Sequence, residues 1–251
     1  MTQPALLLAA HGSPDPAHAR TVEALRRKVA VTWPGAVAHG FLDHDQPLVG
    51  SALLSLAAGG SLDVIAVPLL LTPAYHRRVD IPAAVDAARR LEPSLNVVIA
   101  PVLAPSPLLL EAAARRLAEA GVRRGDPATA LVVAGAGSGD ADALQVVENL
   151  AQAEARQGWW GVVAGYASGA GRSVAYAVRD LRSSGAPSVA VAPLLLARGR
   201  LASVVAAQAR GAGADVVADV LGAGPEVASL VIERAQFASN RLALASASKG
   251  E

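Results

Sequence analysis

The sequence predicts an α/β protein made of two similar lobes, each a four-stranded parallel sheet flanked by helices. Short apolar runs rich in Val, Leu and Ala alternate with stretches of helical period, as is typical of parallel sheets covered on both faces. The chain also matches itself at an offset of 125 residues, where residues 6–15 meet 131–140 and residues 67–71 meet 192–196. We therefore expect one β-α-β-α-β-α-β-α unit that occurs twice.

In each half, an apolar run predicts a strand and the stretch after it predicts a helix. The first half has strands near 5–10, 37–42, 63–68 and 96–101, and helices near 17–32, 47–59, 79–91 and 106–121. The second half has strands near 129–134, 161–166, 188–192 and 215–220, and helices near 140–157, 171–184, 200–212 and 225–242. Turn residues Gly125, Asp126 and Pro127 mark the join. The expected lobes are 1–125 and 126–245, followed by a tail at 246–251.

Composition excludes several classes of site and partner. The absence of cysteine rules out disulfides, thiolate metal ligands and a cysteine nucleophile, so any metal must be held by imidazole and oxygen. A net charge of +1 without an aromatic-studded basic stretch does not indicate a nucleic-acid partner. Pro, Gly or a charge interrupts every apolar run before it reaches membrane-spanning length, and no signal stretch is recognised. We expect a cytoplasmic protein without a membrane partner, with arginine pairs such as Arg115-Arg116 and Arg123-Arg124 on solvated helix faces or ends.

Candidate functional residues follow the carboxyl ends of the expected strands, where ligands bind in sheets of this kind. His11 follows the first strand, Asp43 follows the second, and Tyr75 and His76 come after the third. The equivalent edge of the second half offers Ser138, Ser168, Arg198 and Arg200. If a pseudo-twofold axis relates the halves, the two edges line one cleft.

The histidines are distributed unevenly between the two copies. All 5 histidines occur at or before His76. At the offset of 125, Ala136 stands opposite His11 and Leu201 stands opposite His76. A histidine followed by glycine at a strand end is, taken alone, as often structural as catalytic, and His18 and His39 are expected to be surface or packing residues. We expect the first lobe to carry the chemistry.

Two segments taken together resemble a known family. One is residues 11–16, His-Gly-Ser-Pro-Asp-Pro, and the other is residues 68–82, Pro-Leu-Leu-Leu-Thr-Pro-Ala-Tyr-His-Arg-Arg-Val-Asp-Ile-Pro. With the Phe-Leu-Asp stretch at the end of the second expected strand, they resemble the sirohydrochlorin chelatases, class II lyases that insert a divalent metal into a tetrapyrrole without a nucleotide. The resemblance is strong in the first half and covers the second half as a degenerate repeat.

The resemblance implies that His11 and His76 hold the incoming metal and accept pyrrole protons. Histidine suits both tasks, since it is a base near neutrality and a borderline metal ligand. Asp43 falls where members of the family commonly have glutamate, and it is implied as a further metal ligand. Because aspartate is one methylene shorter, it either contacts the metal or orients a histidine. His44 and Asp45 follow at once, but alternation along an extended segment turns His44 to the face opposite Asp43.

The substrate of that family carries eight carboxylates, so the resemblance implies hydrogen-bond donors and cations around it. The expected substrate-binding residues are Ser13, Arg77, Arg78, Ser138, Arg198 and Arg200. Backbone amides beside Ser13 and Ser138 lie near helix N-termini and are also expected to bind a carboxylate. The second lobe is expected to clamp the substrate.

The function implied is insertion of Fe²⁺ into sirohydrochlorin to give sirohaem, with no cofactor beyond the substrate metal. Cobalt insertion for cobalamin synthesis is the alternative within the same fold, because the residues do not separate the two metals. An alternative of another class is a tetrapyrrole or small-molecule binding protein without turnover, although a passive carrier needs no paired histidines. A phosphoryl-transfer enzyme with His11 as nucleophile would need a second histidine and an arginine pattern that do not follow His11.

Overall fold

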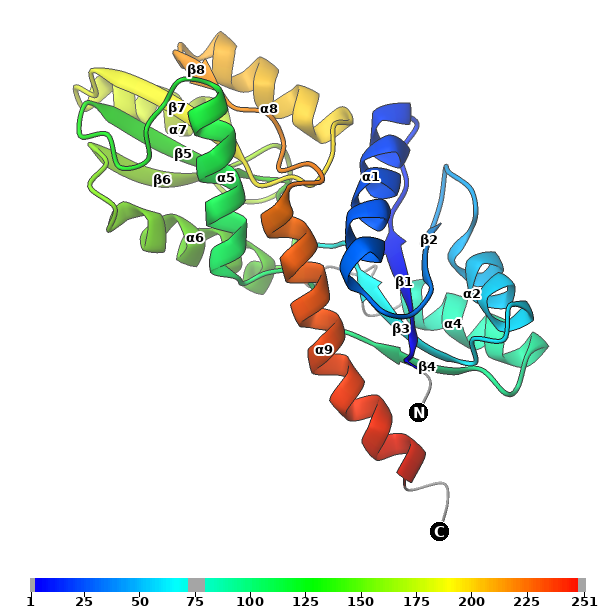
Figure 1. Ribbon diagram of the computed structural model, residues 1–251. Helices are drawn as coiled ribbons and strands as arrows, with labels where there is room; N and C mark the ends of the chain where they lie inside the picture. The colour runs from blue at the N-terminus through cyan, green and yellow to red at the C-terminus, as the bar shows by residue number, and fades with distance from the viewer. Residues whose placement is uncertain (1–2, 72–79, 248–251) are drawn as a thin grey trace. The chain divides into compact units, whose positions relative to one another are not determined.

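The structure, a computed structural model, describes residues 3–71 and 80–247, with side chains placed as far as residue 240. Contacts divide it into two compact units: unit 1 comprises Met1–Leu103 and Val227–Glu251, and unit 2 comprises Ala104–Glu226. Each unit contains one four-stranded parallel sheet flanked by helices (Figure 1). The fold class expected from the sequence is confirmed.

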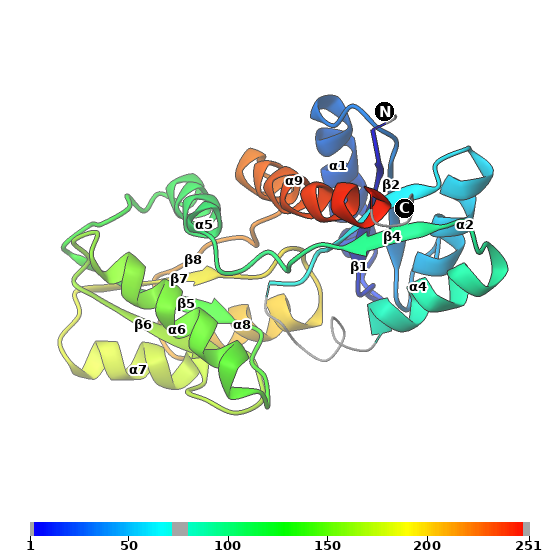
Figure 2. The same ribbon diagram turned by 90° about the horizontal axis from the view of Figure 1, so that it is seen from below.

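The sheet of unit 1 has the strand order β2-β1-β3-β4. Its strands are β1 (Ala5–Ala10), β2 (Val37–Phe41), β3 (Asp63–Pro68) and β4 (Asn96–Ile99). Figure 2 shows one face covered by α1 (Pro16–Thr32) and α9 (Pro225–Ala247), and the other by α2 (Val49–Ala58) and α4 (Asp80–Leu91). Strand β1 is buried along its whole length, because helices cover both of its faces.

The sheet of unit 2 repeats this topology with the order β6-β5-β7-β8. Its strands are β5 (Thr129–Gly135), β6 (Gly161–Tyr166), β7 (Ser188–Pro193) and β8 (Val216–Val217). Figure 1 shows α7 (Val174–Ser183) and α8 (Arg200–Gly211) on one face, and α5 (Pro107–Glu119) and α6 (Ala141–Ala155) on the other. Alanine and valine of β5 and β7 fill the core under α7 and α8.

Equivalent side chains begin the first helix of each half. The carboxylates of Asp15 and Asp140 accept the N–H groups of Ala17 and Asp142, both at 2.9 Å. These bonds satisfy amides that have no partner within the helix. Each helix therefore starts at a fixed place just beyond the carboxyl end of the central strand.

The strands and helices expected from the sequence are all found, with shifts at their ends. Strand β8 (Val216–Val217) is shorter than the expected 215–220, and at Val220 the N–H already bonds to the side chain of Asp219 at 2.9 Å. Helix α9 continues to Ala247, so residues 246–247 are helical and do not belong to a tail, and residues 248–251 lie outside the described residues. Within 3–71 and 80–247, no helix is both long enough and apolar enough to cross a membrane.

The last helix of each half belongs to the unit of the other half. Helix α5 follows β4 of unit 1 in the chain but is part of unit 2, whereas α9 follows β8 of unit 2 and is part of unit 1 from Val227 onward. The contact-defined units therefore differ from the expected lobes 1–125 and 126–245. Sequence order assigns each helix to the half that it follows, but it does not show which sheet covers the apolar face of the helix.

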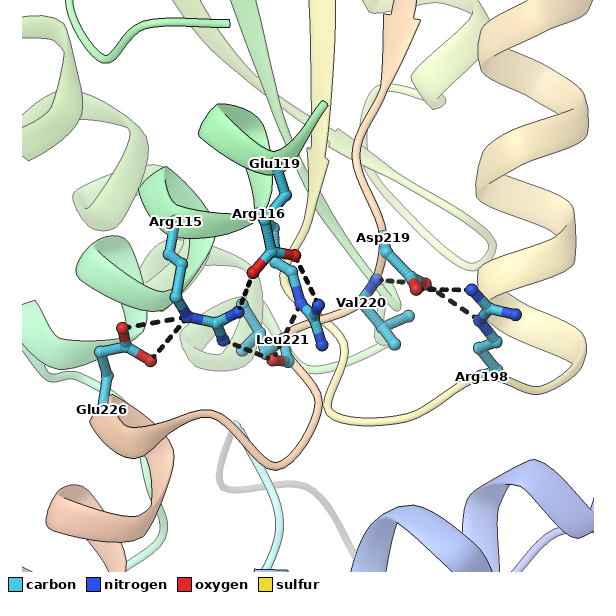
Figure 3. Close-up of polar contacts among 8 residues, drawn as sticks. All are labelled: Arg115, Arg116, Glu119, Arg198, Asp219, Val220, Leu221 and Glu226. Atoms are coloured by element: carbon cyan, nitrogen blue, oxygen red, sulfur yellow. Dashed lines mark hydrogen bonds and ion pairs between the residues drawn. The ribbon is translucent and has the colours of Figure 1, made fainter. Parts of the chain in front are cut away.

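Arginines hold both exchanged helices to the chain just beyond the fourth strand of a sheet. On α5, Arg115 and Arg116 donate to the carbonyl of Leu221, at 3.2 and 3.3 Å (Figure 3). On α9, Arg234 donates to the carbonyls of residues 102–103, at 2.8 and 2.7 Å. These contacts give partners to carbonyls that lie past the sheet ladder. The expectation that Arg115 and Arg116 lie on a solvated face is wrong.

Two histidines of unit 1 pack against Phe41 of β2. The ring centroid of His39 lies 5.3 Å from that of Phe41, and the centroid of His18 lies 6.1 Å from it. Burial lowers the pKa of both histidines, an effect that Asp45 partly opposes at His18 and Glu23 partly opposes at His39. Both rings are thus held neutral near pH 7, and both are packing residues.

An ion pair between the half-buried Arg124 and a buried carboxylate fixes the segment between α5 and β5. The side chain of Glu154 on α6 is 4% exposed and accepts two hydrogen bonds from Arg124, at 2.9 and 2.7 Å. The Nε1–H of Trp159 donates a third at 3.1 Å. Arg124 was expected to lie in solvent, which is wrong, because it pairs with a carboxylate that burial would otherwise leave without a counter-charge.

Removal of Arg124 is expected to destabilise unit 2. Arg124→Ala leaves the Glu154 carboxylate buried with only the Trp159 donor, and we expect the free energy of unfolding to fall by about 3 kcal/mol. Urea titration followed by tryptophan fluorescence measures the loss. Arg123→Ala, a substitution of the exposed neighbour, is the matched control and should stay within about 0.5 kcal/mol of the unmodified protein. Equal effects of the two substitutions would contradict the role given to Arg124.

Acid is expected to destabilise unit 1 through His18 and His39. Their folded pKa values lie below the 6.5 of an unperturbed histidine, so the unfolded state binds protons first as the pH falls. Stability should be complete above about pH 6.5 and should fall as the pH drops from there toward the folded pKa values. Melting temperatures from about pH 8 to about pH 5 test this, and the double substitution His18→Gln/His39→Gln should flatten the slope below pH 6.5. An unchanged slope would exclude these two groups as its cause.

Candidate functional site

The candidate site of unit 1 lies at the carboxyl ends of adjacent parallel strands. His11 directly follows β1, and Asp43 comes two residues after the end of β2. In the order β2-β1-β3-β4, the connection after β1 runs toward β2, whereas the connection after β3 runs toward β4, so the two connections diverge between β1 and β3. Ligands of open parallel sheets bind at such topological switch points. The placement of His11 and Asp43 at one edge agrees with the sequence analysis.

The turn after β1 lies closer to the turn after β2 than a side chain would allow. Gly12 has a φ of 98°, and a Cβ built on it would lie 1.7 Å from the carbonyl oxygen of Asp43. The N–H of Asp43 donates to the carbonyl of His11 at 2.9 Å. Only glycine fits this approach. His11, which is half-buried, is thereby fixed beside residues 43–45.

Asp45 binds the amide that was expected to receive a substrate carboxylate. Its Oδ2 accepts the N–H of Ser13 at 3.0 Å, and the Oγ of Ser13 accepts the N–H of Asp15 at 3.1 Å. The Ser13 amide is therefore occupied by a carboxylate of the protein. A serine hydroxyl that accepts a hydrogen bond can still donate its own hydrogen. The binding of substrate by Ser13 stays a prediction that rests on this hydroxyl.

His44 does not point away from the site as strand alternation suggested. Strand β2 ends at Phe41, and the N–H of Asp45 donates to the carbonyl of Asp43 at 2.7 Å, which closes a three-residue turn around His44. The φ of His44 is 64°, in the left-handed region. Its ring lies parallel to that of His11 within 27°, with the centroids 6.5 Å apart. The sequence expectation fails because the chain is no longer extended at this position.

The Asp43 carboxylate faces His44. Its Oδ1 accepts the backbone N–H of His44 at 2.7 Å, and its Oδ2 lies 3.6 Å from the Nε2 of the His44 ring.

Among the described residues, no three histidine, aspartate or glutamate side chains are placed to form a complete metal centre. The expected site residues His76, Arg77 and Arg78 lie outside the described residues.

The corresponding edge of unit 2 keeps the backbone of this site without its histidine. A Cβ on Gly137 would lie 1.7 Å from the carbonyl oxygen of Ser168, as at Gly12. The N–H of Ser168 donates to the carbonyl of Ala136 at 3.1 Å. Ser138, an expected substrate-binding residue, uses its Oγ to accept the N–H of Asp140 at 3.0 Å. The repeat therefore preserves the two touching turns and replaces the side chain that carries the chemistry.

The two expected substrate-binding arginines of unit 2 differ in their surroundings. Arg198 donates to both oxygens of Asp219, at 3.1 and 2.6 Å (Figure 3). These bonds hold the pKa of the Asp219 carboxyl below its usual range. Arg200 is exposed, begins α8 and has no ion-pair partner within the part of the chain that the structure describes. Leu201, which stands opposite His76 at the offset of 125, is the second residue of α8.

The chain is similar in sequence to one family over nearly its whole length. The family model described as CbiX matches residues 5–120 and again residues 130–238, so both halves carry the pattern. The sirohydrochlorin cobaltochelatase of Priestia megaterium is 34% identical over 146 residues, which are 55% of this chain and 46% of that protein. The match thus spans less than half the length of this curated relative.

Solved structures share the fold. SirB from Bacillus subtilis with Fe³⁺ has a TM-score of 0.80 and 20% identity, with 96% of this chain and 97% of that chain covered. The sirohydrochlorin chelatase SirB from Bacillus subtilis subspecies spizizenii in complex with cobalt has a TM-score of 0.72 and 22% identity, with 95% and 97% covered. With the family model matching both halves, the chain belongs to the CbiX family, which confirms the resemblance to sirohydrochlorin chelatases that the sequence indicated.

Proposed function

We propose that this protein inserts a divalent metal ion into sirohydrochlorin. The observation that carries the proposal is the half-buried imidazole of His11, which is fixed at the switch point of the unit 1 sheet. The chain belongs to the CbiX family. A ligand bound beyond this edge meets a side chain that can both hold a metal and accept a proton. The related protein of Priestia megaterium is named for the same substrate, which adds support.

The chemistry asks two things of the residues around the macrocycle. Two pyrrole protons must leave, and the water shell of the ion must be exchanged for the nitrogens of the tetrapyrrole. Imidazoles serve both needs, because they accept protons near neutral pH and bind Fe²⁺ or Co²⁺ less tightly than a set of thiolates would. We assign these tasks to His11 and His76, with Asp43 beside them. The metal is a substrate here, and no further cofactor is proposed.

Cationic and hydroxyl groups are proposed to bind the carboxylates of the substrate. Arg77, Arg78 and Ser13 are assigned to this role in the first half, and Ser138, Arg198 and Arg200 in the second. The side chains of Arg198 and its partner Asp219 are 66% and 39% exposed, and such exposed pairs contribute little to stability. A substrate carboxylate can therefore replace Asp219 at small cost. This gives the second half the clamping role expected for residues 126–245.

Iron and cobalt are both supported as the inserted metal. The donor types, imidazole and carboxylate, accept either ion. Iron insertion would give sirohaem, whereas cobalt insertion would serve cobalamin synthesis, and the curated relative is named for cobalt.

The first test is metallation itself. Purified protein incubated without oxygen with sirohydrochlorin and either Fe²⁺ or Co²⁺ should convert the free macrocycle to its metal complex without added nucleotide. The absorbance change follows the reaction, and the ratio of kcat/KM for the two ions identifies the favoured metal. If neither ion is inserted while the macrocycle still binds, the protein is a carrier and the chelatase proposal fails.

The second test removes the histidines. His11→Ala should lower kcat by about 100-fold or more, because a positioned proton acceptor is lost, and should leave binding of sirohydrochlorin intact. The double substitution His11→Ala/His76→Ala should abolish metallation and still bind. His39→Gln, which removes a packing histidine of the same unit, is the matched control and should keep full activity. A His11→Ala protein as fast as the unmodified one would exclude His11 from the reaction.

A further inference from the structure

The carboxylate of Asp43 is directed to its neighbour in the chain. Both of its oxygens face His44: Oδ1 accepts the backbone N–H at 2.7 Å, and Oδ2 lies 3.6 Å from Nε2 of the ring. In the family that the sequence resembles, glutamate commonly occupies this position, and aspartate reaches one methylene less far. The shorter side chain is thus already in contact with a group of its own turn.

The imidazole of His44 lies beside that of His11. The two rings are 6.5 Å apart between centroids and within 27° of parallel, and the His44 side chain is 43% exposed. An ion held by two imidazoles at metal–nitrogen distances of about 2 Å keeps the ring centroids roughly 5–6 Å apart. The observed centroid separation of 6.5 Å is close to this range.

The second repeat shows that the turn does not need a histidine. His44 is the only residue other than glycine with a positive φ among residues 3–71 and 80–247. The equivalent position in unit 2 is Gly169, with a φ of 74°. Glycine adopts this conformation without steric cost, whereas a residue with a Cβ does not. The backbone conformation therefore belongs to the fold, and the histidine in unit 1 is present in spite of it.

We propose that His44 is a further imidazole that acts beside His11 on the incoming metal, and that Asp43 is its positioning residue. This inference rests on the proposed chelatase function and assigns a ligand within that site. The negative Oδ2 of Asp43 favours the proton of the His44 ring on Nε2, which leaves Nδ1 as the nitrogen that binds metal. With two donors from this edge, the other positions around the ion stay available for the other ligands assigned to the site, for water and for the nitrogens of the macrocycle.

The substitution made by the second repeat provides the test. His44→Gly removes the ring and suits the left-handed backbone, so the melting temperature should be unchanged or higher. The affinity of the protein for Co²⁺ alone, measured by titration calorimetry, should fall about tenfold or more, and the visible spectrum of bound Co²⁺ should change. His44→Asn, which also tolerates a positive φ, should behave in the same way. His39→Gln should keep the affinity and the spectrum of the unmodified protein.

Substitution of Asp43 separates positioning from direct ligation. Asp43→Asn keeps an oxygen for the His44 N–H and removes the charge, so it should weaken Co²⁺ binding less than His44→Gly does and shift the spectrum of the bound ion. If Asp43→Asn reduced Co²⁺ affinity while His44→Gly left it unchanged, Asp43 would be the ligand and the inference would be overturned.

The outcome also distinguishes this inference from the proposed function. If the unmodified protein metallates sirohydrochlorin and His44→Gly matches it in both rate and Co²⁺ affinity, the chelatase proposal stands and the role of His44 falls. If the unmodified protein metallates nothing, the proposed function falls, and the Co²⁺ affinities alone decide whether His44 binds metal.

Discussion

The contact between the backbone of Gly12 and the carbonyl of Asp43 is the constraint on which the site depends. A Cβ at Gly12 would lie 1.7 Å from that oxygen, so two turns from different strand ends touch only because one of them has no side chain there. The contact sets His11 beside residues 43–45, and the carboxylate of Asp45 reinforces it through the Ser13 amide. The same contact recurs at Gly137 and Ser168 in unit 2, where Ala136 stands in place of His11. It is therefore a property of the fold that one copy uses to align chemical groups.

A second constraint completes the two units. Each sheet receives the helix that follows the fourth strand of the other half, and arginines on these helices bond to carbonyls beyond the fourth strand. A carbonyl past the end of a ladder needs a partner, and a guanidinium can reach it from a helix that is not its neighbour in sequence. The network of Arg115, Arg116, Glu119 and Glu226 in Figure 3 extends this contact on unit 2. Neither half of the chain completes its own sheet with its own last helix.

The site itself was only partly readable from the sequence. His11 and Asp43 could be placed at one sheet edge, because parallel strands end on the same side. The orientation of His44 could not, since it depends on where β2 stops and on a turn whose central φ is 64°. Two contacts could also not be predicted: Asp45 binds the Ser13 amide, and Asp219 binds the Arg198 side chain. In both cases the partner lies many residues away in the chain. Gly169 aligns with His44 in the repeat, and both have a positive φ. This correspondence can be recognised only when the dihedral angles are known.

The sequence by itself determined the α/β class, the internal repeat, the order of strands and helices, and the edge at which His11 lies. These follow from apolar periodicity and from self-similarity, which are local properties of the chain. The tertiary structure decided which helix covers which sheet, which arginines are paired, and which side of the turn presents His44. Those outcomes depend on contacts between residues far apart in the chain, and on backbone angles that no spacing of residue types encodes. The physical reason is that the burial of a side chain and its hydrogen-bond partners depend on which residues lie next to it in the folded chain.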